Sequence, residues 1–229
     1  MNDRIIGIIG GMGPEATADF YQRFVNSTKV EKDQEHFHVV IDSNPKIPDR
    51  TKAILCGEKN PLPEIIKTAK NLEKIGVEIA CIPCLTSHYY IKEIQESVNY
   101  KIINILKELN TYIINNYKHI KKVGILATSG TVEMKLFNQH LREVEIIYPD
   151  KKIQEEKVME AIYGKKGIKR GNLKNEPVRH LIEASENLKN NGAEAIIFGC
   201  TEIGLALKQK HVSLQIIDPL DVAIKELIK

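Results

Sequence analysis

The sequence of 229 residues has no tryptophan, few cysteines and no long apolar run. Its 14 glycines and 9 prolines are too few for a collagen-like or mucin-like chain, and a hydrophobic content of 42% is too high for a disordered one. No apolar stretch approaches the roughly 20 residues that span a bilayer, and the first residues lack the apolar core of a signal peptide. We therefore expect a cytoplasmic globular protein whose 4 cysteines stay thiols.

An excess of charge of either sign is also missing. The 33 lysines and arginines against 30 acidic residues leave a net charge of +3. This value does not indicate nucleic acid or a membrane surface as the partner, so any electrostatic role must be local. The expected partner is a small molecule.

What the sequence does contain is an alternation of apolar, β-rich runs with longer stretches of helical period. This alternation is typical of an α/β fold in which helices cover a parallel sheet. We expect two Rossmann-like lobes of three layers each. The predicted strands are 4–10, 38–41, 77–83, 122–127, 193–199 and 215–219, and the predicted helices are 15–27, 62–75, 87–97 and 221–228.

The second half of the chain repeats the first. Gly124 follows Gly7 by 117 positions in a similar apolar run, and Cys200 follows Cys84 by 116 positions, each just after a predicted strand. Because these two pairs of residues have nearly the same spacing, they indicate a duplication. The predicted lobes are 1–102 plus 208–229, carrying Cys84, and 103–207, carrying Cys200. Because ligands of open α/β sheets bind beyond the carboxyl ends of strands, we expect both cysteines to line one cleft between pseudo-twofold-related lobes.

The position of these two cysteines predicts reactive thiols. A cysteine between a strand and a helix lies near the first amide groups of the helix, which favour the thiolate over a thiol of ordinary pKa, about 8.5. Two such groups on opposite faces of one molecule suit proton transfer at a single carbon. One sulfur removes a proton and the other supplies one from behind, so the product is the mirror image.

Other interpretations of the cysteines compete with this one. Cys56, in a predicted loop, and Cys81, inside a strand, are interpreted as ordinary small apolar residues. Cys81 and Cys84 also match the C-x-x-C pattern of a redox dithiol. A metal site formed by Cys81, Cys84, His88 and Cys200 is a further alternative, although no second pair with zinc spacing occurs, so no metal is predicted. We expect His88 on a helix surface or at the rim of the cleft.

Seven motifs, spread over nearly the whole chain, cover residues 8–17, 33–36, 44–51, 82–88, 124–131, 169–172 and 199–202. Together they resemble the aspartate/glutamate racemase superfamily and, within it, the aspartate racemase branch. The resemblance implies racemisation of an acidic amino acid by Cys84 and Cys200 without pyridoxal phosphate or another cofactor, in a homodimer of two-lobed chains.

The resemblance also implies roles for individual side chains. Arg50, in a proline-rich loop, and Lys169 are expected to bind the side-chain carboxylate of the substrate, for which a guanidinium is well shaped. One departure stands out: Leu85 occupies the place of an asparagine that helps to hold the substrate. The contact to the α-carboxylate or ammonium group must then come from Thr86, Ser87 or another group. Apart from the resemblance, Glu202 next to Cys200 is expected either to orient the cysteine or accept a proton, or to cap the start of the following helix. The remaining predicted contacts are Met12, Asn44, Thr86, Ser87, Ser129, Gly130, Thr131 and Thr201.

Two turns are interpreted separately. The Gly10–Gly13 turn lacks the spacing of a phosphate-binding loop, so we interpret it as a tight turn that brings backbone close to a small ligand. The Thr128–Thr131 turn offers hydroxyls and amides either to a carboxylate or to helix capping.

The function stays open in two directions. One alternative is an amino-acid-binding homologue that does not catalyse, and another is a related reaction such as hydantoin racemisation, maleate isomerisation or malonate decarboxylation. Within the racemase interpretation, aspartate and glutamate differ by one methylene, which a pocket separates by only about 1–3 kcal/mol.

Overall fold

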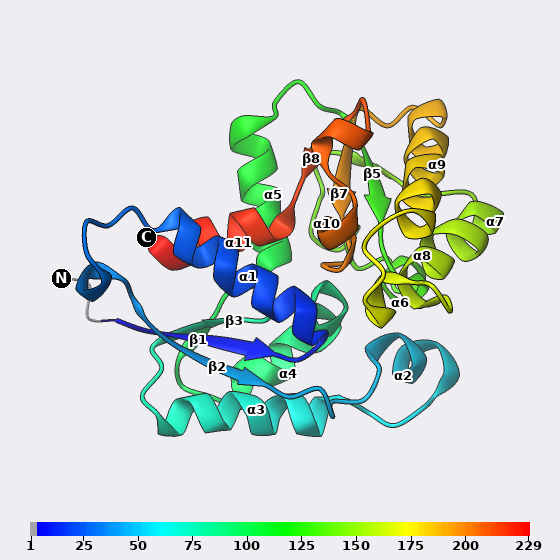
Figure 1. Cartoon of the computed structure of the whole chain (residues 1–229). Helices are drawn as coiled ribbons and strands as arrows, with labels where there is room; N and C mark the ends of the chain where they lie inside the picture. The colour runs from blue at the N-terminus through cyan, green and yellow to red at the C-terminus, as the bar shows by residue number, and fades with distance from the viewer. Residues whose placement is uncertain (1–3) are drawn as a thin grey trace. The chain divides into compact units, whose positions relative to one another are not determined.

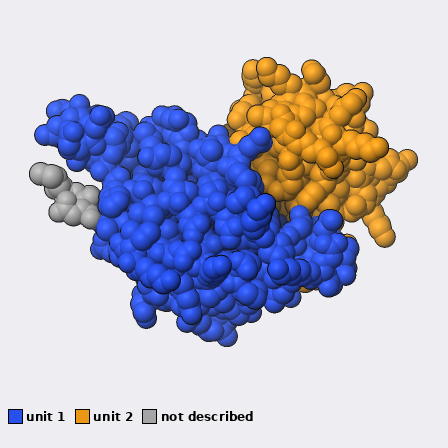
Figure 2. All heavy atoms as spheres, turned by 60° about the horizontal axis from the view of Figure 1, so that its bottom comes forward, with its two compact units in different colours: residues 1–108, 220–229 blue, residues 109–219 orange. Residues whose placement is uncertain are grey.

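The computed structural model describes residues 4–229, and the chain forms two compact units (Figure 2). Unit 1 comprises residues 1–108 and 220–229, and unit 2 comprises residues 109–219. Each unit holds a four-stranded parallel sheet flanked by helices, so the predicted α/β class is confirmed. Within residues 4–229, no helix is both long and apolar enough to cross a membrane.

The sheet of unit 1 has the strand order β2-β1-β3-β4. In Figure 1, α1 and α11 lie on one side of this sheet, and α3 and α4 lie on the other. The strands are β1 (Ile5–Gly10), β2 (His38–Ser43), β3 (Ile79–Cys81) and β4 (Lys101–Ile102). The helices are α1 (Pro14–Ser27), η1 (Asp33–Glu35), α2 (Arg50–Cys56), α3 (Leu62–Lys74), η2 (Leu85–Tyr90), α4 (Ile91–Glu96) and α11 (Pro219–Ile228).

Unit 2 repeats this arrangement, with the strand order β6-β5-β7-β8. The boundary between the units falls within α5 (Ile105–Asn116). The strands are β5 (Lys122–Leu126), β6 (Glu145–Ile147), β7 (Ala195–Phe198) and β8 (Gln215–Ile217). The helices are α6 (Ser129–Glu133), α7 (Lys151–Ile153), the π-helical η3 (Gln154–Met159), α8 (Glu160–Tyr163), η4 (Ile168–Arg170), α9 (Glu176–Asn190), α10 (Ile203–Ala206) and η5 (Gln209–His211).

The structure moves one segment from the first unit to the second. Residues 208–219 were predicted to complete the N-terminal lobe, but β8 pairs in parallel with β7 through Ile196 and Ile216. The chain returns to unit 1 only at Leu220, and it leaves unit 1 after Glu108 rather than after residue 102. A three-residue strand carries no apolar pattern that could have indicated its sheet.

Close packing of a helix on the central strand recurs in both units. A Cβ on Gly7 of β1 would lie 2.8 Å from Val77 Cγ1, and one on Gly124 of β5 would lie 2.8 Å from Leu188 Cδ1. Glycine at these positions therefore lets α3 and α9 approach the sheet. Both helices end at a left-handed glycine, Gly76 or Gly192. The following amide bonds back to Leu72 O in unit 1 and to Leu188 O in unit 2, the Schellman arrangement.

Candidate functional site

Cys84 lies where the chain leaves β3 and enters η2. It occupies the position before the first residue of η2, in an extended conformation, and its carbonyl accepts a hydrogen bond from Ser87 N. The side chain is 6% exposed. The predicted placement between a strand and a helix is confirmed, although the first turn after Cys84 is a 3-10 helix that begins before the expected residue 87.

His88 is buried, contrary to the prediction of a helix surface or a rim. Its Nδ1 lies 3.0 Å from Cys84 O, and Ile105 N donates to its Nε2 at 3.2 Å. Because Nε2 accepts, the ring proton is on Nδ1, which donates to Cys84 O. His88 therefore fixes the backbone of Cys84 and is not available as a metal ligand.

Arg50 is the first residue of α2 and is buried, whereas the sequence analysis placed it in a proline-rich loop. Asp49 caps this helix by accepting a hydrogen bond from Lys52 N at 2.9 Å. The guanidinium donates to Pro48 O at 2.9 Å, Ile47 O at 3.4 Å and Met12 O at 3.3 Å. Arg50 is thus a buried cation oriented by backbone carbonyls.

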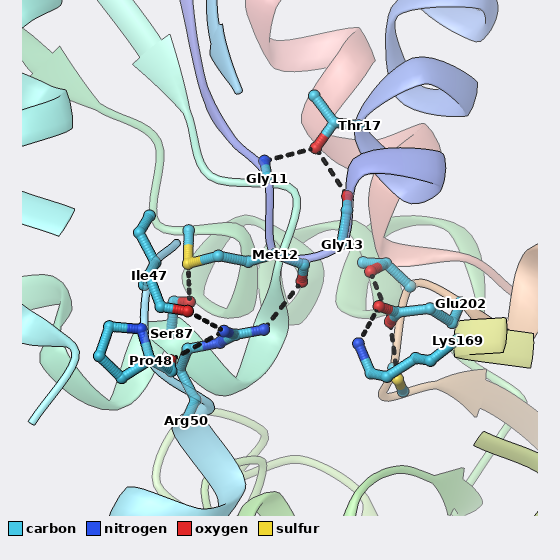
Figure 3. A network of polar contacts seen from close by, with 12 residues as sticks. Gly11, Met12, Gly13, Thr17, Ile47, Pro48, Arg50, Ser87, Lys169 and Glu202 are labelled. Atoms are coloured by element: carbon cyan, nitrogen blue, oxygen red, sulfur yellow. Dashed lines mark hydrogen bonds and ion pairs between the residues drawn. The ribbon is translucent and has the colours of Figure 1, made fainter. Parts of the chain in front are cut away.

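The glycine-rich turn after β1 completes this cluster, as Figure 3 shows. Gly11 N donates to Thr17 Oγ1 at 2.9 Å, and a Cβ on Gly11 would lie 2.5 Å or less from backbone atoms of Asn44. The turn therefore requires glycine for close contact with the Asn44 segment. Ser87 Oγ donates to Met12 Sδ at 3.3 Å. Four predicted site residues of unit 1, Met12, Asn44, Arg50 and Ser87, are thus joined directly or through this turn.

Two further residues of η2, Leu85 and Thr86, are buried. Leu85, where the motif resemblance led us to expect an asparagine, is only 1% exposed. Thr86 and Ser87 supply the aliphatic hydroxyls in this segment.

The other two cysteines, Cys81 and Cys56, differ in their exposure to solvent. Cys81 is within β3, fully buried, and burial raises the pKa of its thiol far above the ordinary range. Cys56 is exposed at the last residue of α2 rather than in a loop. All four cysteines are free. Within residues 4–229, no three His, Cys, Asp or Glu side chains gather in a way that could hold a metal.

Cys200 occupies the corresponding place in unit 2, two residues after β7. Gly199 N donates to Leu126 O at 2.7 Å, which extends the pairing with β5 up to the cysteine. The thiol lies 3.0 Å from Glu202 Oε2, to which Thr201 Oγ1 also donates at 3.2 Å. The other carboxylate oxygen forms an ion pair with Lys169 of η4 (Figure 3).

The electrostatics at Cys200 differ from the sequence prediction of a favoured thiolate. Burial and the Glu202 carboxylate hold the pKa of the Cys200 thiol well above its usual value, against the opposing charge of Lys169. Burial also raises the pKa of Glu202, but the charge and hydrogen bond of Lys169, together with the Cys200 thiol, lower it below its usual value. The following helix α10 has only four residues, so its dipole does little to offset the carboxylate.

The Thr128–Thr131 turn is part of an internal network that the sequence did not predict. Ser129 Oγ donates to Glu155 Oε1 at 2.6 Å, and Ser129 N donates to Met159 Sδ at 3.3 Å. Gln154 Nε2 donates to Ala127 O at 2.9 Å. Thr128, Ser129, Gly130 and Thr131 are all buried. The residues of η3 were missed because no motif marks them, although π-helical turns are frequent at functional sites.

The predicted site residues thus divide into one set in each unit, and most of them follow the carboxyl end of a strand. The set of unit 1 is Met12, Asn44, Arg50, Cys84, Thr86 and Ser87, and the set of unit 2 is Ser129, Gly130, Thr131, Lys169, Cys200, Thr201 and Glu202. The fold and these sets define a class: an α/β protein of two similar units, each presenting a cysteine beyond a central strand.

The chain belongs to the Asp/Glu/Hydantoin racemase family, whose model matches residues 9–227. This confirms the family predicted from the motifs. Picrophilus torridus aspartate racemase is 28% identical, with a TM-score of 0.81 over 98% of this chain and 93% of that one. An aspartate racemase homologue from Pyrococcus horikoshii is 25% identical, with a TM-score of 0.75 over 100% of this chain and 98% of that one.

Among curated proteins, the broad specificity amino-acid racemase RacX of Bacillus subtilis (strain 168) is 29% identical over 153 residues. The match covers 64% of this chain and 65% of RacX, so it spans less than two thirds of that relative.

Proposed function

We propose that the chain racemises an acidic amino acid, aspartate or glutamate, by proton transfer between Cys84 and Cys200 without a cofactor. The observation that carries the proposal is the equivalent position of the two cysteines, each beyond the third strand of a 2-1-3-4 sheet. Membership of the Asp/Glu/Hydantoin racemase family and the likeness to an aspartate racemase support it.

The proposed reaction moves two protons between the substrate and two sulfurs, one of which begins as a thiolate and the other as a thiol. A thiolate takes the α-proton as the C–H bond breaks, and the electron pair stays on the substrate as a carbanion next to the carboxylate. The other cysteine gives its thiol proton to the opposite face. The enzyme ends with the proton on the first sulfur and a thiolate at the second, so exchange with water must restore the starting form.

The side chains around the cysteines supply substrate contacts in this proposal. Arg50 and Lys169 bind the side-chain carboxylate of the substrate. A charge-assisted hydrogen bond contributes about 1.5–3 kcal/mol, so these cations favour acidic substrates over neutral ones. The Lys169 ammonium has three donors and can hold a substrate carboxylate while paired with Glu202. The α-amino and α-carboxylate groups of the substrate are bound by the hydroxyls of Thr86, Ser87, Thr131 and Thr201. Further substrate contacts come from Met12, Asn44, Ser129 and Gly130.

The decisive test is incorporation of deuterium from heavy water into the α-position. Purified protein is incubated with L-aspartate, D-aspartate, L-glutamate or D-glutamate, and label and enantiomer are followed by proton NMR and chiral chromatography. We expect label in the product enantiomer in both directions. If none of the four amino acids takes up label, the assignment to acidic amino acids is wrong.

Two other outcomes of this test define the alternatives. Binding of aspartate in calorimetry without any α-proton exchange would identify a binding protein. Turnover only in a panel of neutral amino acids, hydantoins, maleate and substituted malonates would assign a related activity, and neutral amino acids belong in the panel because RacX is named for broad specificity. We also propose that the chain is cytoplasmic and forms a homodimer. Size-exclusion chromatography with light scattering would test the dimer.

A further inference from the structure

Cys200, Glu202 and Lys169 form a linear chain of contacts inside unit 2. The Cys200 thiol lies 3.0 Å from one oxygen of Glu202, and Lys169 is paired with the other oxygen. Glu202 is only 4% exposed, and Lys169 also lies 5.5 Å from the centre of the Tyr163 ring. A buried carboxylate with this geometry is held in place by a cation on one side and a thiol on the other.

The chain of contacts fixes where the thiol proton lies. An ionised carboxylate has only acceptors, so the hydrogen in the contact with Cys200 must be on sulfur. A thiolate in its place would put two negative groups 3.0 Å apart in a buried environment. Lys169 keeps Glu202 ionised, and so it acts on Cys200 both directly and through the carboxylate.

The surroundings of Cys84 differ. The hydrogen bonds of this residue involve its backbone: its N–H donates to Ile82 O at 2.7 Å, and its carbonyl accepts from Ser87 N and from His88 Nδ1. Among the described residues of unit 1, no carboxylate is hydrogen-bonded to the Cys84 sulfur, whereas Glu202 is bonded to the Cys200 sulfur within unit 2. The two cysteines therefore occupy equivalent positions in the fold, and the charged groups that their own units place beside them differ.

We propose that Glu202, held by Lys169, keeps Cys200 protonated in the enzyme without substrate, so that Cys200 begins the reaction as the proton donor and Cys84 as the base. This inference rests on the proposed function and deepens it. Glu202 is a positioning residue here, because it acts on the reaction through the sulfur, and Lys169 has this effect in addition to its proposed contact with the substrate carboxylate. After one turnover the thiolate is at Cys200, beside Glu202, and the starting form returns when Cys200 regains a proton and Cys84 loses one.

The first test measures the protonation of Cys200 directly and needs no turnover. The ultraviolet absorbance of the thiolate is titrated against pH, and the signal of Cys200 is the difference between each protein and the same protein carrying Cys200→Ala. In Glu202→Gln we expect the midpoint to fall by about 1–3 pH units, since a like charge is removed. In Lys169→Met we expect it to rise, because a favourable cation is lost.

The matched control is Glu186→Gln, an exposed residue of α9, which should leave the midpoint unchanged. Circular dichroism verifies that each variant is folded. An unchanged midpoint in folded Glu202→Gln, or shifts of the same sign in Glu202→Gln and Lys169→Met, would overturn the inference. Because the titration is independent of substrate, a failure of the proposed racemisation would be seen separately, as absence of deuterium incorporation.

The second test uses turnover. The alkaline limb of the kcat/KM profile reports loss of the donor proton, so in Glu202→Gln this limb should move to lower pH. The profile reports macroscopic values of the cysteine pair, and the shift is therefore compared with that of Glu186→Gln under identical conditions. A simple loss of activity with an unchanged profile would indicate a structural role for Glu202 and would contradict the proposal.

Discussion

The two units share a scaffold but differ in the groups around their cysteines. In unit 1 the buried cation Arg50 donates to carbonyl oxygens, which carry no net charge. In unit 2 the cation Lys169 is paired with Glu202, which also accepts from the cysteine. Duplication therefore preserved the strand order and helix packing, while the electrostatics of the two sites diverged.

The correspondence of the scaffolds extends to single hydrogen bonds. Glu78 Oε1 accepts from Ile5 N at 2.9 Å at the start of β1, and Glu194 Oε2 accepts from Lys122 N at 3.1 Å at the start of β5. The two glutamates are 116 positions apart, as are Cys84 and Cys200. Against so close a match, the carboxylate beside Cys200 stands out as a difference in chemistry rather than in fold.

The largest effects should come from the cysteines. Cys84→Ala and Cys200→Ala should each reduce racemisation at least about 10³-fold, because each removes a general acid or base. Each variant retains one sulfur, so deuterium exchange without inversion should persist for a different enantiomer in each. The exchange should be weaker in Cys84→Ala, because Glu202 holds the remaining Cys200 in its protonated form. Chiral chromatography and proton NMR measure both quantities.

Cys81→Ala and Cys56→Ser are the matched controls for these variants and should keep most of the activity. Complete loss in a correctly folded Cys81→Ala protein would favour the dithiol interpretation instead. Equal exchange of both enantiomers by both active-site variants would contradict a two-base mechanism.

The cations should have the next largest effect, on affinity. Arg50→Met should raise the Kd for aspartate about 10- to 150-fold, which corresponds to 1.5–3 kcal/mol, and should leave the Kd for asparagine nearly unchanged. Lys169→Met should have a smaller effect, since Glu202 already offsets its charge. Calorimetric titration of both ligands measures this selectivity, and a larger effect of Lys169→Met would reverse the comparison.

Much of this comparison was readable from the sequence. Apolar runs around Gly7 and Gly124, and the cysteines after residues 77–83 and 193–199, indicated two α/β units and their equivalent positions. These signals are local, because each depends on a few adjacent residues that form one strand and one turn. The family motifs added the candidate contacts around them.

What the sequence did not indicate depends on distance or on short elements. Lys169 and Glu202 are 33 residues apart, and only the packing of η4 near Cys200 brings them together. His88 was expected at a helix surface or at the rim of the cleft, because polar residues in a helical pattern usually face solvent. The sequence does not indicate that the amide of Ile105, 17 residues later, donates a hydrogen bond to this side chain. Strands as short as β4 and β8 carry no period, which also explains the misplacement of residues 208–219.

Moderate and similar losses of stability should follow when the tightly packed glycine of the central strand is replaced in each unit. Gly7→Ala and Gly124→Ala should each lower the free energy of unfolding by about 1–3 kcal/mol, because the new methyl overpacks a tight contact. Urea denaturation measures both. Adding Val77→Ala to Gly7→Ala should recover part of the loss, since it removes the closest methyl group. A loss in only one unit would indicate that the packing is not equivalent.

The smallest effects should come from the two glycines that end α3 and α9. Gly76 and Gly192 have φ values of 86° and 93°, where an L-residue costs about 1–2 kcal/mol, and neither position has a steric barrier within 3.5 Å. Alanine also restricts the unfolded chain, which returns about 0.4–1 kcal/mol, so each Gly→Ala variant should lose about 1 kcal/mol or less. Asparagine, which tolerates this conformation, should lose less at both positions. Both glycines have a left-handed φ and end their helices with the same hydrogen bonds, so the two variants should lose similar free energies of unfolding. Unequal losses in urea denaturation would mean that the helix ends of the two units have diverged, as the surroundings of the cysteines have.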